Sequence, residues 1–355
     1  MKFFEKIFSI KKELKYKIIN ILGLQFKVYT VKPQIEELYS LCFEARKILE
    51  ELDPYVKLAK LKKSEINKPL IDVEIEKFQR KNILGTDSLS TDSPKLIVSL
   101  TSFPERMYDI HYAIFSLLNQ SLKPYKVILW LSEEQFPNKE NDLPKKLLNF
   151  KNYGLEINFT KDIRSYKKSI PTLKMYPDDI LVTADDDIFY PKNWLELLYT
   201  DYQKHPDCIL AHRVHKILFD ENKKLLPFRE WKRLINDGSS SLLNFPSTGG
   251  GVLYPPNSLY KDVLNEEIFT KLSKNSDEIW FWAMAILNKT KVKVAENAIN
   301  TISIINAERE AFCANEIILA RENSTTKNLK DKQINNLLEY YPELYNTLLK
   351  EWRNS

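Results

Sequence analysis

Residues 179–191 read DILVTADDDIFYP, an apolar strand that runs directly into three consecutive carboxylates. Asp185, Asp186 and Asp187 repel one another, and they are costly in a packed interior unless cations or a metal pair with them. Alternate residues of an extended chain point the same way, so Asp185 and Asp187 can face one site while Asp186 turns aside. Carboxylate oxygens suit Mg2+ or Mn2+, which also bridge phosphates. A solvated acidic turn is the alternative, and the apolar strand before the triplet argues against it.

From Lys95 onward, the sequence on both sides of this stretch alternates strand-like and helix-like segments. Strands are expected over 96–100, 126–132, 155–160, 179–187 and 208–214, and helices over 107–118, 143–150, 170–177 and 194–204. Such alternation predicts an α/β fold, with a mostly parallel central sheet flanked by helices on both faces. Binding sites in these sheets lie at the carboxyl ends of the strands, which is where the acid triplet stands.

The scarcity of glycine and histidine excludes several kinds of site. The 355 residues include only seven glycines and four histidines. They form no spaced-glycine dinucleotide fingerprint, no phosphate loop with a Gly-Lys pair and no His-Glu-x-x-His zinc motif. Any bound phosphate must therefore be held by carboxylates with a metal, or by lysine and arginine.

Cysteine usage and charge indicate the compartment and the kind of partner. Cys42, Cys208 and Cys313 are widely spaced and odd in number, which argues against a disulfide framework and fits a reducing compartment. The net charge of +5 does not require a nucleic-acid partner. No apolar run approaches the roughly 20 residues that span a bilayer. We therefore expect a cytoplasmic protein that binds no nucleic acid.

Three of the seven glycines are consecutive, in the stretch NFPSTGGGVLY that covers residues 244–254. Glycine permits backbone conformations and close approaches that a side chain would block. Gly249, Gly250 and Gly251 therefore predict a tight turn beneath a ligand or a catalytic loop. A flexible connector is the alternative, but the flanking residues are apolar rather than serine-rich.

Two acidic residues open an apolar helix in the stretch SDEIWFW, residues 276–282. Carboxylates are favoured at a helix N-terminus, which is sufficient to explain one acid there.

These motifs together resemble a known family. An Asp-Asp-Asp triplet followed by Pro191 and Trp194 resembles the Asp-x-Asp region of glycosyltransferases with the nucleotide-sugar-binding GT-A fold. SLTSFPERMYDIHYAIFSLLNQSLKPYKVILWLS (99–132) and KDIRSYKKSIPTL (161–173) resemble a bacterial branch of that group, found among capsule and lipooligosaccharide enzymes. The resemblance runs from about Lys95 to Val294 and does not cover residues 1–90.

The resemblance implies a role for each motif. Thr101, Pro104 and Arg106 would form a loop against the nucleotide, with Asp162 on its base or ribose. Lys168 would contact the diphosphate, together with Asp185 and Asp186, and Asp187 with Asp185 would hold Mn2+ or Mg2+. Gly249, Gly250, Gly251 and His212 would line the acceptor and the donor sugar. Asp277 or Glu278 would deprotonate the acceptor hydroxyl, with Asp277 slightly favoured. Each charged residue is alternatively an ordinary surface charge, and His212 an ordinary core histidine.

The implied function is transfer of a sugar from a nucleotide donor, most simply a UDP-sugar, to a surface glycan that is free or lipid-linked. One alternative enzyme class is a metal-dependent sugar-phosphate transferase or nucleotidyltransferase, which also uses acidic clusters. A second alternative is a catalytically dead scaffold in glycan assembly, against which the intact triplet and glycines argue.

The first 90 residues form a separate region in this interpretation. Residues 1–27 carry seven lysines and two glutamates among phenylalanine and isoleucine, a pattern that predicts a basic amphipathic helix. It can lie on the inner face of a membrane or pack on a protein surface. Residues 33–63 are also expected to be helical, and 88–94 to be a linker. The expected division is therefore a helical appendage over 1–90, a GT-A-like domain over 95–310 and a helical extension over 311–355.

Overall fold

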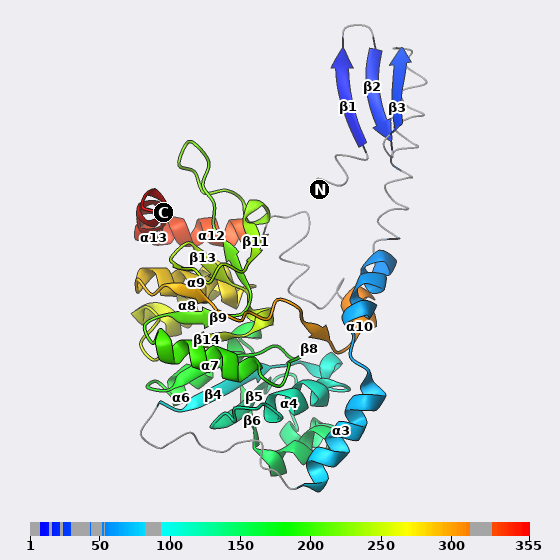
Figure 1. Ribbon diagram of the computed structural model, residues 1–355, viewed down its shortest axis with the longest axis vertical. Coiled ribbons are helices and arrows are strands. Elements are labelled where there is room, and N and C mark those ends of the chain that lie inside the picture. Colours follow the sequence, from blue (N-terminus) through cyan, green and yellow to red (C-terminus); the bar gives the residue numbers. More distant parts are fainter. Residues whose placement is uncertain are drawn as a thin grey trace. The chain divides into compact units, whose positions relative to one another are not determined.

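The computed structural model describes residues 8–13, 16–21, 24–29, 54–81, 94–312 and 329–355, together with Phe43 and Leu52 (Figure 1). The chain divides into two compact units, one of Met1–Lys63 with Glu310–Phe312 and one of Ser64–Arg309 with Cys313–Ser355. The linker expected over 88–94 lies outside the described residues except for Pro94.

The first unit contains a three-stranded antiparallel sheet where a helix was expected. Its strands run in the order β1-β2-β3 and are β1 (Phe8–Glu13), β2 (Tyr16–Ile21) and β3 (Leu24–Tyr29). The predicted amphipathic helix over 1–27 is therefore wrong for these residues. The segment is rich in isoleucine, phenylalanine and tyrosine, which favour strands, and the strand register places Ile19 opposite Phe26.

The second unit is built on an eight-stranded sheet in the order β12-β15-β9-β14-β7-β4-β5-β6. The strands are β4 (Leu96–Thr101), β5 (Lys126–Ser132), β6 (Leu155–Thr160), β7 (Ile180–Thr183), β9 (Ile209–Ala211), β12 (Ser240–Ser241), β14 (Val252–Tyr254) and β15 (Val292–Val294). Strands β4, β5, β6 and β7 are parallel to one another, as are β9 and β15, whereas β14 is antiparallel to both its neighbours. The expected α/β fold with a mostly parallel central sheet is confirmed.

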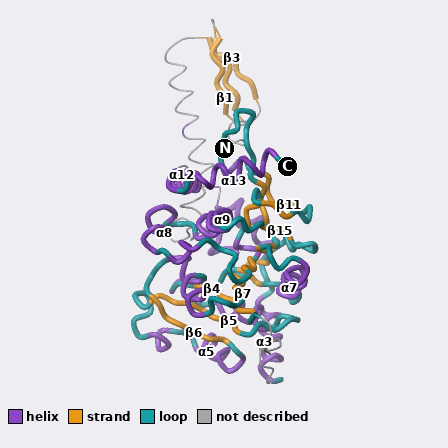
Figure 2. Tube along the Cα trace, turned by 90° about the vertical axis from the view of Figure 1, so that its left-hand side faces the viewer, coloured by secondary structure: helices purple, strands orange, loops and turns teal. Residues whose placement is uncertain are grey.

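Helices cover both faces of this sheet because its strands are apolar on both sides. In β4, Leu96, Val98 and Leu100 belong to one core, while Ile97 lies on the opposite face. The first core includes residues of α3 (Lys68–Arg80), α4 (Ile110–Leu118), α5 (Lys145–Leu148) and α7 (Trp194–Lys204). The second core includes residues of α6 (Ile170–Met175), α8 (Glu266–Ser273) and α9 (Asp277–Leu287). Figure 2 shows the strands between α8 and α9 on one side and α3 and α5 on the other.

The two C-terminal helices belong to the second core. These are α12 (Leu329–Tyr340) and α13 (Pro342–Arg353), whose Leu337, Leu344 and Leu348 are completely buried there. Among the described residues, no helix combines the length and the apolar character needed to cross a membrane.

Smaller elements complete the second unit. Strands β10 (Val214–Lys216), β11 (Lys232–Ile235) and β13 (Asn244–Pro246) form an antiparallel sheet in the order β11-β10-β13. Strand β8 (Ile188–Phe189), directly after the acid triplet, pairs with β16 (Ser303–Ile304). Helix α10 (Ala307–Phe312) follows β16, so the chain returns to the triplet more than one hundred residues later.

The burial of α13 gives a stability prediction. Leu344→Ala should lower the free energy of unfolding by about 2–5 kcal/mol in urea titrations, because it leaves a cavity beneath α13. Leu70→Ala is the matched control, since Leu70 is 62% exposed and its loss should have little effect. Equally small changes in the two variants would contradict a structural role for α13.

Candidate functional site

The acid triplet lies where the direction in which successive strands are added to the sheet changes, between β4 and β7. From β4 the chain adds β5 and β6 on one side, and then returns to place β7 on the other side of β4. Neighbouring parallel strands whose connections leave in opposite directions open a crevice at their carboxyl ends, where such sheets bind ligands. The loop after β4 carries Ser102 and Arg106, and the loop after β7 carries Asp185, Asp186 and Asp187.

Arg106 and Ser102 neutralise the inner part of the triplet. Asp186 accepts a hydrogen bond from Ser102 Oγ at 2.5 Å and one from Arg106 Nη1 at 2.9 Å. The same Nη1 lies 2.8 Å from an oxygen of Asp187. Burial raises the pKa of the Asp187 carboxyl, but the Arg106 guanidinium outweighs burial and holds it below its ordinary value. The side chain of Asp186 is 11% exposed and that of Asp187 is 24% exposed, so Asp186 is the one turned inward.

Lys168 joins the triplet to the start of α9. Its Nζ lies 2.8 Å from Asp185 Oδ1 and 3.3 Å from Asp277 Oδ2, and its side chain is 6% exposed. Burial disfavours the ammonium form, but the two carboxylates outweigh burial and raise the pKa of Lys168 well above its ordinary value. Two sites that lie more than ninety residues apart in the sequence thus share one buried cation.

The triple glycine lies beside the same triplet, and two of its members have clear steric reasons. Gly251 has a φ of +86°, and a Cβ there would lie 2.3 Å from the indole of Trp194. A Cβ on Gly250 would lie 2.6 Å from Cγ of Arg213. Trp194 Nε1 donates a hydrogen bond of 2.7 Å to the Gly250 carbonyl, which fixes the turn. The nearest atoms to a Cβ on Gly249 are at ordinary contact distance, and one of them is Asp185 Oδ2 at 3.8 Å.

Glu278, which follows Asp277 directly, has a cation partner of its own. It forms an ion pair with Lys330 of α12. Burial raises the pKa of the Glu278 carboxyl, and Lys330 outweighs burial so that the pKa falls below its ordinary value. Asp277, by contrast, shares the buried Lys168 ammonium with Asp185 of the triplet, so it is the predicted candidate that this contact joins to the centre.

Three residues expected around the nucleotide are separate from the triplet's contacts. Thr101 donates its hydroxyl to the Trp130 carbonyl at 2.8 Å, and Pro104 is exposed at the start of a 3-10 turn. Asp162 is exposed and accepts hydrogen bonds from Lys167 Nζ at 2.5 Å and from the Arg164 backbone at 2.9 Å.

His212 lies in the core, and the expectation that it lines the acceptor site is corrected. It is completely buried. Its Nδ1 accepts a hydrogen bond from the Ile299 amide at 3.2 Å, and its Nε2 lies 3.0 Å from the Trp194 carbonyl. Both ring nitrogens therefore bind backbone groups, which leaves none for a ligand. The sequence alone does not show that this ring is buried.

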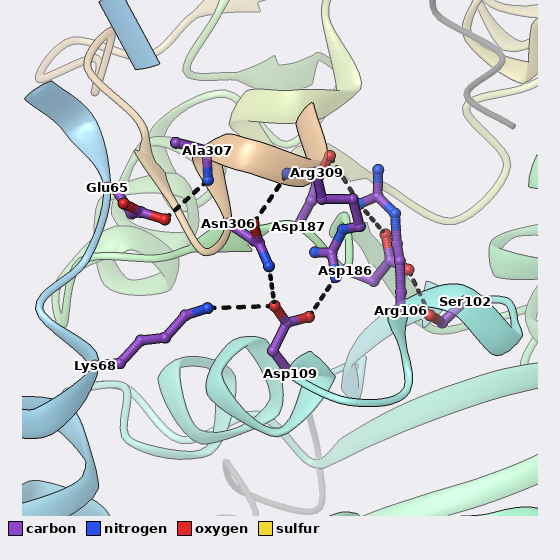
Figure 3. Close-up of polar contacts among 10 residues, drawn as sticks. All are labelled: Glu65, Lys68, Ser102, Arg106, Asp109, Asp186, Asp187, Asn306, Ala307 and Arg309. Atoms are coloured by element: carbon purple, nitrogen blue, oxygen red, sulfur yellow. Dashed lines mark hydrogen bonds and ion pairs between the residues drawn. The ribbon is translucent and has the colours of Figure 1, made fainter. Parts of the chain in front are cut away.

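A second ionic cluster adjoins the triplet and was not expected from the sequence (Figure 3). Asp109, whose side chain is 1% exposed, accepts from Arg309 at 2.5 Å, from Asn306 at 3.0 Å and from Lys68 at 3.4 Å. Arg309 also acts electrostatically on the carboxylates of Asp186 and Asp187. The Ile305 amide donates to the Asp187 carbonyl at 3.0 Å, so the returning segment is bound to the triplet's backbone as well.

The fit of a divalent cation depends on what surrounds the triplet. Within the described parts of the chain, no group of three or more His, Cys, Asp or Glu side chains is arranged to hold a metal. Asp185 and Asp187 are the two partly exposed carboxylates of the triplet. The pKa of Asp185 is raised, mainly because the carboxyl is buried and in addition because the Asp187 carboxylate repels it. This set fits an ion that takes one or two protein carboxylates and completes its shell with substrate phosphates and water.

The comparisons with known proteins identify no family. No family model matches the chain, and no curated protein matches it. Among solved structures, the chain is similar to the crystal structure of S. aureus TarS 1-349, with a TM-score of 0.39, 12% sequence identity, and coverage of 70% of this chain and 73% of that one. The fold assignment therefore rests on the strand order of the sheet.

The glycine geometry predicts an order of stability. Gly251→Ala should lower the unfolding free energy by about 2 kcal/mol or more, because it strains the backbone and meets the Trp194 ring. Gly250→Ala should cost somewhat less, since the backbone there does not have a positive φ, although its methyl would meet Cγ and Cβ at the base of the Arg213 side chain. Gly249→Ala should be close to the wild type. Thermal unfolding followed by circular dichroism measures this order, and an Ala at 249 as harmful as one at 251 would contradict it.

The contacts of His212 predict its ionisation. Burial lowers its pKa to about 4, so the ring stays neutral at pH 5.5 with its proton on Nε2. Because the folded pKa lies below that of the unfolded chain, this group's contribution to stability is present above about pH 6.5 and is lost as the pH falls towards 4. Nitrogen-15 NMR of the imidazole measures both, and a cationic ring at pH 5.5 would refute the assignment.

Proposed function

We propose that the protein is a glycosyltransferase that moves a sugar from a nucleotide donor to a glycan acceptor. The observation that carries the proposal is one arrangement of residues at the carboxyl ends of β4 and β7. Asp185 of the triplet lies beside the glycine turn at Gly249 and is joined through Lys168 to the carboxylate of Asp277. A donor with a diphosphate leaving group needs cations at one end and a base near the acceptor at the other, and this crevice supplies both.

The donor diphosphate is proposed to lie beside the triplet. Arg106 and Lys168 are the cations already bound there, and a Mn2+ or Mg2+ ion held by Asp187 and Asp185 would join them. The metal would supply Lewis-acid neutralisation of the charge that develops on the nucleoside diphosphate. Lys168 keeps the Asp185 carboxylate in place, and Arg106 keeps Asp186 turned inward.

Asp277 is proposed as the base for the acceptor. Its carboxylate lies at the first turn of α9, 3.3 Å from the Lys168 ammonium. It would take the proton of an acceptor hydroxyl while that oxygen forms the new glycosidic bond and the bond to the diphosphate breaks. A base on the acceptor side leads to inversion at the anomeric carbon.

The partners in this proposal are a nucleotide sugar, most simply a UDP-sugar, and a capsule or lipooligosaccharide glycan, free or lipid-linked. We also propose peripheral contact of residues 1–27 with the inner face of the cytoplasmic membrane. This segment contains β1, β2 and most of β3. Basic residues beside an anionic surface contribute about 1 kcal/mol each, whatever the secondary structure that presents them.

A panel of nucleoside diphosphates and nucleotide sugars, tested by thermal shift with Mn2+, identifies the donor. The matching nucleotide should raise the melting temperature, because ligand that binds the folded state stabilises it. Asp187→Asn should keep the fold but lose the metal-dependent part of the shift and at least about 100-fold in transfer rate.

Asp207→Asn is the matched control, since Asp207 is exposed and lies outside the site. It should behave as the wild type does. Full activity of Asp187→Asn, or of the wild type in excess EDTA, would contradict the metal role. Release of a nucleoside monophosphate or pyrophosphate, and not of a nucleoside diphosphate, would identify a sugar-phosphate transferase or nucleotidyltransferase instead.

A further inference from the structure

The guanidinium of Arg213 is a cation at the site that the proposed reaction has not used. Arg213 follows β9 and lies between the buried His212 and the strand β10. Within the described residues, its side chain makes no hydrogen bond or ion pair, and its Nε is buried without a partner. A buried polar group of this kind is costly unless something binds it, so the position calls for an explanation.

The glycine turn holds this guanidinium in one place. The Arg213 stem crosses Gly250 so closely that a Cβ there would lie 2.6 Å from its Cγ, 2.9 Å from its Cβ and 3.0 Å from its Cδ. The Ser247 amide also donates to the Arg213 carbonyl at 2.8 Å, which ties the backbone of the arginine to the start of the same turn. Gly250 is therefore a glycine because an arginine lies over it.

Gly249 marks the space that the guanidinium faces. A Cβ built there would lie 3.8 Å from Arg213 Nη1 and 3.8 Å from Asp185 Oδ2, so the position stands between a cation and a carboxylate of the triplet. The backbone does not need glycine at this position, because its nearest neighbour, Ile188 Cδ1 at 3.5 Å, is at ordinary contact distance. The absent side chain leaves room here, where Arg213 Nη1 and Asp185 Oδ2 are both near.

We propose that Arg213 binds an anionic oxygen group of the nucleotide sugar in the space beside Gly249. The group is a phosphate of the diphosphate or a carboxylate on the transferred sugar, both of which a guanidinium binds through two parallel hydrogen bonds. This inference rests on the proposed function and assigns a donor-binding residue to it. In this arrangement Lys168 binds Asp185 on one side, and Arg213 and the bound ligand lie on the other side of Asp185.

The variants Arg213→Met and Arg213→Lys test the inference. Methionine keeps a flexible apolar stem across Gly250, and lysine keeps the charge but loses the paired hydrogen bonds. Isothermal titration with the nucleotide sugar that most stabilises the wild type should show about 10- to 100-fold weaker binding for Arg213→Met, and an intermediate loss for Arg213→Lys. Arg353→Met, at an exposed position in α13, is the matched control and should bind as the wild type does.

A second arm separates the two sources of the anion. Uridine diphosphate glucose and uridine diphosphate glucuronate differ only in the sugar carboxylate. Loss of affinity for both, and for the free diphosphate, places Arg213 on a phosphate. Loss of a wild-type preference for the glucuronate, with unchanged diphosphate binding, places it on the sugar carboxylate.

Gly249→Ala provides the independent check. It should fold normally and yet weaken binding of the same ligand by about tenfold, because its methyl group occupies the proposed space. If Arg213→Met and Gly249→Ala both bind every ligand as the wild type does, the inference is overturned while the proposed function stands. If the wild type binds no nucleoside diphosphate, no nucleotide sugar and no inorganic pyrophosphate, both proposals fall together.

Discussion

Three adjacent carboxylates cannot be brought to the end of a buried strand unless positive groups meet them there. The second unit meets this constraint with cations from separate parts of the chain: Arg106 after β4 and Lys168 before α6. Lys168 also connects a second element, because it reaches Asp277 at the start of α9, whereas Arg106 spans two carboxylates of the triplet itself. Charge neutralisation and the assembly of the site are thus the same set of contacts.

The two-sided sheet makes this arrangement rigid. The strands that carry the loops, β4 and β7, lie side by side at its centre with apolar side chains on both faces. Trp194 of α7 connects the glycine turn to the core. Its ring packs against Gly251 and donates a hydrogen bond to the Gly250 carbonyl, and its own carbonyl accepts one from His212. Trp194 therefore holds the glycine turn, and it belongs to the same core as residues of β4 and β7, the strands that position the triplet.

Local patterns predicted the parts of this structure that local physics determines. The strands and helices between Lys95 and Val214 follow their apolar periodicity. The triplet and the glycines were predicted from residue type and position, and Lys168 and Asp277 from the resemblance to glycosyltransferases. Contacts in the structure connect these residues. The failures have definite causes. Residues 1–27 satisfied a helical charge pattern, yet isoleucine-rich and aromatic content favoured strands. His212 looked like a site residue because sequence does not reveal that two backbone groups bind its ring. Ser102 and Asp109 bind partners distant in sequence, and Arg213 lies over Gly250, all of which only the folded chain brings together.

The central claim is that the crevice between the triplet and the glycine turn holds the diphosphate of a nucleotide sugar. A crystal structure of the full chain with Mn2+ and the best-binding nucleoside diphosphate tests it most directly. The account predicts phosphate density between Asp187 and Gly249, with an anomalous manganese peak at a carboxylate of the triplet. A nucleotide bound at any other place in the molecule, with the crevice filled only by the Arg106 and Lys168 ion pairs, would contradict it.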